Sequence, residues 1–143
     1  MIVAMQQDHL RRLDLQEAQS FFGTMMNDPE YLAGLVSGGP AYTLLGGNEV
    51  LACAGIVPQW QNRAMAWALV GKNAGRAMVA LHRAVLRCFE IHPHKRIETT
   101  VASKFAEGHR WARMLGFERE GTMTAFAPDG ADYDLYARIQ WHS

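Results

Sequence analysis

The sequence has little of several features that mark particular protein classes. Fourteen basic and fourteen acidic side chains cancel, so the chain carries no net charge. It therefore lacks the surplus positive charge with which a general nucleic-acid binder displaces counterions, and we expect no nucleic-acid partner. Its two cysteines, Cys53 and Cys88, sit in apolar runs without a Cys or His neighbour at the spacing of a zinc site. We expect reduced core thiols and no metal.

Long apolar runs are also missing. No stretch approaches the roughly 20 residues of a membrane span, and residues 1–12 offer too few apolar side chains before charge appears for a signal peptide. These absences predict a soluble, cytoplasmic protein without a membrane partner. The 143 residues are 49% apolar, which suits one domain, spanning 1–143, that folds alone.

Apolar periodicity and turn signals predict a mixed order of elements: strand, two helices, three strands, helix, strand, helix and two strands. The expected strands are 2–5, 41–46, 50–59, 63–70, 96–101, 117–126 and 132–139, and the expected helices run from Asp14, from Asn27-Asp28-Pro29-Glu30 to Ser37, from after Gly71 to before His92, and over 105–115. Because a helix joins strands 63–70 and 96–101, these two should be a parallel pair in a mixed sheet.

The segment Lys72-Asn73-Ala74-Gly75-Arg76-Ala77 lies between a predicted strand and an amphipathic helix. The first turn of a helix leaves backbone N–H groups unpaired, and a turn of small residues lets phosphate oxygens approach them. Lys72 and Arg76 would add full positive charges. The segment is thus a candidate pyrophosphate site, the alternative being a tight strand-to-helix turn. Neither GxGxxG nor GxxxxGK[ST] is present, so an NAD or ATP enzyme is not expected.

This segment resembles the (Gln/Arg)-x-x-Gly-x-(Gly/Ala) motif of the GCN5-related N-acetyltransferases (GNATs), with Lys in the first position. The run Met114-Leu115-Gly116-Phe117-Glu118-Arg119-Glu120-Gly121 resembles a second passage of the same family, and the element order is similar. The resemblance implies an α/β fold whose mixed central sheet carries helices on both faces. Within the family, Trp67-Ala68-Leu69, the Arg-rich third helix and the run 132–138 are similar to phage acetyltransferase-like proteins, including internal virion protein A, which implies host cytoplasm or virion.

The resemblance also implies where acetyl-coenzyme A binds and what it meets. The cofactor would lie in a V-shaped gap between strands 63–70 and 96–101. The backbone of Leu69 and Val70 would pair with the pantetheine arm and aim an N–H at the thioester oxygen. The amides of Asn73, Ala74, Gly75, Arg76 and Ala77 would hold the pyrophosphate, beside Lys72. The acceptor would be an amine of a small molecule or a protein.

The expected catalytic side chains are less well defined, because the family's usual acid, a Tyr, is replaced by Ala112, and the usual Asn that opens this helix is replaced by Phe105. Glu98 is a candidate general base, or else pairs with an arginine. Ser103 is a candidate thiol or proton contact, or else caps a helix. His109 would face the cleft, or else lie solvated on the surface.

Two functions therefore stay open. One is an N-acetyltransferase that transfers the acetyl group to an amine by direct attack. The other is a catalytically inactive GNAT-fold protein with a binding or virion-structural role. An exposed sheet edge near the C-terminus leaves room for a homodimer.

Overall fold

A computed structural model describes residues 1–13, 29–92 and 94–140 of the chain. Its elements follow the expected order, with one added helix near the N-terminus. They are β1 (Ile2–Ala4), α1 (Gln7–Arg12), α3 (Pro29–Ser37), β2 (Ala41–Gly46), β3 (Glu49–Trp60), β4 (Arg63–Val70), the 3-10 turn η2 (Gly75–Ala77), α4 (Met78–Ile91), β5 (Arg96–Ala102), α5 (Ala106–Met114), β6 (Glu118–Met123) and β7 (Tyr133–Ile139).

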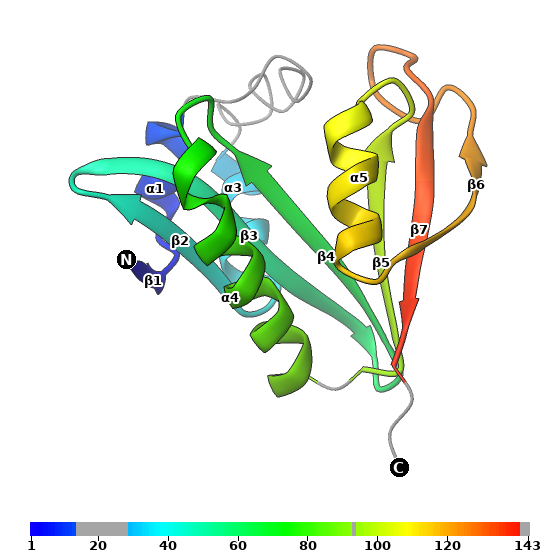
Figure 1. Cartoon of the computed structure of the whole chain (residues 1–143), viewed down its shortest axis with the longest axis horizontal. Helices are drawn as coiled ribbons and strands as arrows, with labels where there is room; N and C mark the ends of the chain where they lie inside the picture. The colour runs from blue at the N-terminus through cyan, green and yellow to red at the C-terminus, as the bar shows by residue number, and fades with distance from the viewer. Residues whose placement is uncertain (14–28, 93, 141–143) are drawn as a thin grey trace.

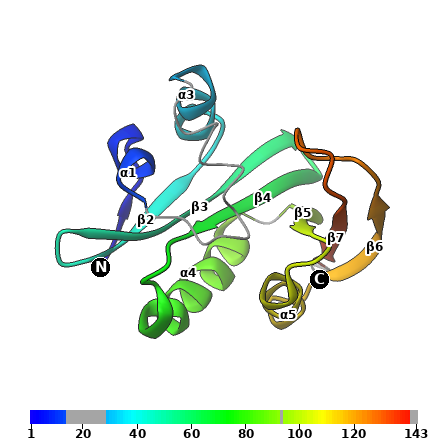
Figure 2. The same cartoon turned by 90° about the horizontal axis from the view of Figure 1, so that it is seen from above.

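The strands form one seven-stranded sheet in the order β1-β2-β3-β4-β5-β7-β6. Only β4 and β5 run parallel among these pairs, as the helical crossover between them predicts. Helices α1 and α3 lie on one face of the sheet, and α4 and α5 lie on the other (Figure 2). The mixed α/β fold class with helices on both faces is therefore confirmed.

The differences from the predicted elements are local. Helix α1 was not expected, because its six residues contain one apolar side chain, Leu10, and give no periodic signal. A hydrogen bond from the Gln6 backbone N–H to His9 Nδ1 (3.1 Å) closes its first turn. The helix expected from Asp14 lies outside the described residues. Strand β6 ends at Met123 and not at Phe126, since the chain turns at Ala125, whose φ is 55°.

The sheet ends at β6, whose outer side pairs with no other described strand. Its pairing with β7 shifts register between Arg119 and Gly121, which is a β-bulge. Two charged side chains flank this bulge and bond back toward the sheet. Arg119 Nε donates to Asp134 Oδ2 (3.0 Å), and Glu120 pairs with Arg96.

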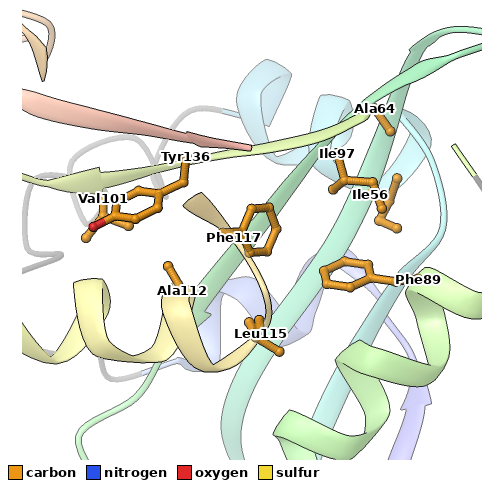
Figure 3. Close-up of a cluster of buried hydrophobic side chains, with 9 residues drawn as sticks. All are labelled: Ile56, Ala64, Phe89, Ile97, Val101, Ala112, Leu115, Phe117 and Tyr136. Atoms are coloured by element: carbon orange, nitrogen blue, oxygen red, sulfur yellow. The ribbon is translucent and has the colours of Figure 1, made fainter. Parts of the chain in front are cut away.

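The main core lies between the sheet and helices α4 and α5. Figure 3 shows its nine side chains, which come from both helices and from five strands or their ends: Ile56, Ala64, Phe89, Ile97, Val101, Ala112, Leu115, Phe117 and Tyr136. The rings of Phe89 and Phe117 meet edge to face, with centroids 5.7 Å apart. This cluster anchors both helices to the same sheet and so fixes the spacing between them.

A second core lies on the α1 face of the sheet and consists of Met5, Leu10, Val50, Cys53 and Leu69. The titration of Cys53 provides a test of burial in this core. Its thiol is fully buried, and burial raises its pKa to about 11, although a contact with Thr43 works in the opposite direction. A thiol with a raised folded-state pKa retains its proton longer in the folded protein, so the free energy of unfolding should fall as pH rises from 9 to 11. We expect Cys53→Ala to remove about 2–3 kcal/mol of this alkaline loss. Urea titrations of both proteins at pH 8 and pH 11 measure the difference, and equal losses would contradict the prediction.

Candidate active site

Strands β4 and β5 pair at only three positions, Arg63–Arg96, Ala64–Ile97 and Met65–Glu98. Beyond Met65 the two strands diverge, as Figure 1 shows. A cavity of about 230 Å³ lies in this region, with walls from both strands and from α4 and α5. Its lining is mostly apolar and includes Ala66, Ala68, Val85, Val101, Trp111 and Ala112. The V-shaped gap that the resemblance implies is therefore present.

The V-shaped gap between β4 and β5 is called the wedge below. The hydrogen-bond pattern of β4 decides which of its backbone groups face the wedge. The Gly71 N–H donates to the Leu51 carbonyl (2.8 Å), and in an antiparallel pair only alternate residues bond to the same neighbour. Leu69, two residues earlier, therefore bonds to β3, whereas Ala68 and Val70 direct their backbone toward β5. The expected contact of the Leu69 backbone with the pantetheine arm is corrected for this reason. The contact of Val70 stays a prediction.

The same alternation applies to β5. The Arg96 N–H donates to the Asn62 carbonyl on the β4 side (2.8 Å), so Glu98, Thr100 and Ala102 also direct their backbone toward β4. Thr100 and Ala102 lie beyond the last paired position and have no partner in β4 within the described strands. The Ala102 carbonyl accepts from the Phe105 N–H (2.9 Å), so Ala102 offers only its N–H to the cavity. Backbone groups in an apolar cavity need a hydrogen-bonding partner. The wedge thus suits an extended ligand that carries amide groups of its own.

The loop after β4, residues 71–77, joins two residues that line the cavity, Val70 and Met78. Ala74 is buried against Val70 and Leu81, which fixes the loop on the core. Ala77 N–H donates to the Ala74 carbonyl (2.7 Å), whereas the N–H groups of Gly75 and Arg76 have no protein acceptor in the described part of the chain. These two N–H groups stand at the start of the helical segment, where an anion is favoured.

Gly75 itself is not required by the folded protein. Its φ is not positive, and a Cβ built on it would meet no atom within 4 Å. Lys72 and Arg76 are exposed beside it, and the Asn73 side chain donates to Glu49 Oε1 (2.7 Å) in the neighbouring hairpin. An exposed, small, cation-flanked turn of this kind fits a diphosphate. Binding by Lys72 and by the backbone of residues 73–77 stays a prediction.

Glu98 occupies the last paired position of β5 and is only 5% exposed. Its carboxylate pairs with Arg63 across the strand boundary and with Arg96 Nη2 (3.3 Å) on its own strand. Arg96 pairs in turn with Glu120, whose hydrogen bond to Arg96 lowers the pKa of the Glu120 carboxyl. Glu98 does not line the cavity. The ion pair with an arginine, one of the two alternatives for Glu98, is therefore present.

Ser103 and His109 lie together, but their polar atoms bond within the protein. His109 Nε2 lies 2.9 Å from the Ser103 carbonyl, which can only accept, so Nε2 carries the proton. In the neutral imidazole Nδ1 then accepts from the Tyr136 hydroxyl (2.7 Å), which occupies the lone pair that a general base would need. His109 is not solvated on the surface, and neither it nor Ser103 lines the cavity.

Asp134 completes this polar cluster between α5 and β7. Its Oδ1 accepts from Ser103 Oγ (2.7 Å) and Thr122 Oγ1 (2.9 Å), and its Oδ2 accepts from Arg119. Burial alone would raise the pKa of Asp134, but these hydrogen bonds together hold it below its usual range. Ser103 thus neither caps α5 nor stands beside the cavity. The cluster instead attaches the helix that forms one cavity wall.

Tyr133 is a candidate that the sequence did not indicate. Ala112, at the position of the family's usual Tyr, does line the cavity, but its methyl group cannot move a proton. Tyr133, the first residue of β7, lies opposite Ala102 and contributes to the same cavity wall. Burial, with a smaller effect of Asp129, raises the pKa of Tyr133 to about 12. Its phenol is therefore protonated at neutral pH and can act as a donor.

No three His, Cys, Asp or Glu side chains of the described ranges come together in a way that could hold a metal ion. Among the described helices, none combines the length and the apolar character needed to cross a bilayer.

No family model matches the sequence, and no curated protein matches it as a relative. Solved structures do match. A structure named for a proposed phosphinothricin N-acetyltransferase activity aligns at TM-score 0.75 and 16% identity, covering 99% of both chains. The IAA acetyltransferase from Bacillus cereus aligns at TM-score 0.73 and 11% identity, covering 98% of this chain and 99% of that chain. A GNAT-family acetyltransferase from Streptococcus pneumoniae aligns at TM-score 0.68 and 14% identity, covering 99% of both chains.

The chain therefore has the fold of the GCN5-related N-acetyltransferases. Identities of 11–16% establish the fold alone, so activity and substrate need an argument from this chain's own site. The neighbours do not bear on the phage branch suggested by residues 67–69 and 132–138.

Proposed function

We propose that this protein is an N-acetyltransferase that uses acetyl-coenzyme A. The observation that carries the proposal is the wedge between β4 and β5. It combines apolar walls, the backbone of Thr100 and the N–H of Ala102 directed inward, and a nearby turn whose Gly75 and Arg76 N–H groups have no acceptor in the described residues. Coenzyme A has the matching parts in the same order: a thiol arm with two amide groups, followed by a diphosphate. Few other common ligands combine an extended diamide with a diphosphate.

Acetyl-coenzyme A supplies an acetyl group activated as a thioester, and its transfer to an amine forms an amide bond and releases the thiol. For this reaction the chain must hold the donor, exclude water and manage two protons. The amides of Gly75 and Arg76 hold the diphosphate, with Lys72 adding charge. The backbone of Thr100 and the N–H of Ala102 bond to the thiol arm. The apolar walls exclude water, which strengthens every polar contact inside.

Within this proposal Tyr133 is the proton donor to the departing thiolate. It is on the cavity wall, it is protonated at neutral pH, and its place in the sheet is opposite Ala102, whose backbone faces the wedge. Glu107 is the one carboxylate among the described residues on that wall, and it lies exposed in the first turn of α5. The amine's proton can leave through this exposed end.

A catalytically inactive protein with the same fold is the second candidate, and one observation favours it. Glu98, Ser103 and His109 bond within the protein, and Ala112 carries no polar group. A protein of this kind would keep coenzyme A binding, or a partner surface, without turnover. A virion-structural role would belong to this second candidate.

Calorimetry and a thiol-release assay separate the two. We expect coenzyme A and acetyl-coenzyme A to bind the purified protein with micromolar affinity, and a panel of small amines and lysine peptides to include acceptors that release free thiol. Binding without release for any amine would favour the inactive protein. Absence of binding at millimolar concentration would overturn both the cofactor assignment and the proposed activity.

A further inference from the structure

We propose that the buried ion pair between Glu98 and Arg63 sets the point at which β4 and β5 separate, and so positions the cofactor-binding edge of β5. Glu98 is then a positioning residue and not a general base. The inference rests on the proposed function, because it concerns the same wedge, and it assigns the buried carboxylate a role in cofactor binding.

The place of this ion pair in the sheet is the first argument. Only three positions hold β4 and β5 together, and Glu98 is at the last of them, opposite Met65. Arg63, at the first paired position of β4, reaches Glu98 on the other strand, so the ion pair links the two strands up to the point where pairing stops. Side chains of Arg63 and Arg96 are 28% and 31% exposed, whereas that of Glu98 is 7% exposed. The carboxylate is thus covered by the two arginines that neutralise it.

The continuity of β5 from the ion pair into the cavity is the second argument. Glu98, Thr100 and Ala102 direct their backbone toward β4 in alternation, so the position of Glu98 fixes where the next two sets of groups point. Thr100 is one such step beyond the ion pair. A displacement of about 1 Å in a positioned group can cost on the order of a hundredfold in a reaction that depends on it. Loosening the point where β4 and β5 separate should therefore weaken cofactor binding at the wedge.

The contacts of Glu98 also argue against proton transfer. Both carboxylate oxygens are engaged, Oε2 by Arg63 and Oε1 by Arg96, and the residue does not line the cavity. A base must come within hydrogen-bond reach of the proton it removes. Replacement of Glu98 should accordingly change affinity for the cofactor, and leave the shape of the pH profile unchanged.

Glu98→Gln tests this, with Glu120→Gln as the matched control. The control makes the same chemical change in the same network, on the Arg96 partner that is 42% exposed and lies on β6, which is not a neighbour of β4 in the sheet. We expect the dissociation constant of coenzyme A, measured by calorimetry, to rise at least tenfold in Glu98→Gln and less than twofold in Glu120→Gln. In turnover assays the KM for acetyl-coenzyme A should rise more than kcat falls, with unchanged apparent pKa values in the profile.

Arg63→Gln provides a second variant should Glu98→Gln fail to fold, because Arg63 is more exposed and its loss leaves Glu98 paired with Arg96. It should weaken coenzyme A binding in the same direction. Wild-type affinity for coenzyme A in both Glu98→Gln and Arg63→Gln would overturn the inference while leaving the proposed function intact. So would the loss of the acidic limb from the pH profile of Glu98→Gln. A wild-type protein that binds no coenzyme A would overturn both.

Discussion

Gly75→Glu is expected to weaken coenzyme A binding about hundredfold while the protein remains folded. The added side chain would enter open space, because a Cβ at this position meets no protein atom within 4 Å. Its carboxylate would face the same volume as the N–H groups of Gly75 and Arg76, where the diphosphate is proposed to bind. Two like charges about 4 Å apart near a protein surface repel by roughly 4 kcal/mol, more than the roughly 2.8 kcal/mol that a hundredfold loss requires.

Calorimetry with coenzyme A measures this effect, and thermal unfolding verifies the fold. Gly34→Glu is the matched control, since Gly34 is exposed on α3 and a Cβ there also meets no atom within 4 Å. It should bind as the wild type does. An affinity of Gly75→Glu within threefold of the wild type would place the diphosphate elsewhere.

Tyr133→Phe is expected to lower kcat about hundredfold and to leave the affinity for coenzyme A unchanged. Removal of one positioned acid or base typically costs a factor of about 10² to 10⁴. The phenyl ring keeps the packing of Tyr133 against Phe126, whose ring centroid lies 5.4 Å away, so the loss isolates the hydroxyl. Because burial raises the pKa of Tyr133 to about 12, activity that depends on its proton should persist at least to pH 10 in the wild type.

Tyr42→Phe is the control for this substitution. Tyr42 also lines the cavity, but its side chain is 38% exposed. Its turnover should stay within twofold of the wild type. A Tyr133→Phe protein that keeps full turnover, with Tyr42→Phe impaired, would assign proton donation to the other tyrosine; full turnover in both would remove the phenol from the mechanism.

The sequence predicted the framework of the site because that framework depends on local patterns. Strand ranges 41–46 and 63–70 match β2 and β4, and the parallel pairing of β4 with β5 follows from the helical crossover between them. The divergence of these two strands was implied by the family resemblance. The backbone direction of Leu69 was not predictable, since it depends on which residues of β4 bond to β3, and one register step reverses it.

Long-range partners account for the other differences. Glu98 and Arg63 are 35 positions apart, and His109 and Tyr136 are 27 apart, so no local pattern joins them. Periodicity also could not place Tyr133 on the cavity wall, because that placement depends on β7 inserting between β5 and β6. The three expected catalytic side chains were chosen by their chemistry and their position along the chain, whereas long-range contacts across the sheet engage their polar atoms elsewhere.

The bulged strand β6 also limits how the protein can associate with itself. Continuation of the sheet into a second copy would require its outer side to form a regular ladder, yet the register breaks between Arg119 and Gly121, and Glu120 is tied to Arg96. Strand addition at this edge would have to straighten the bulge and compete with the ion pair between Glu120 and Arg96. A dimer of this chain is therefore expected to use a surface other than the β6 edge, and its formation should be insensitive to substitutions along 118–123.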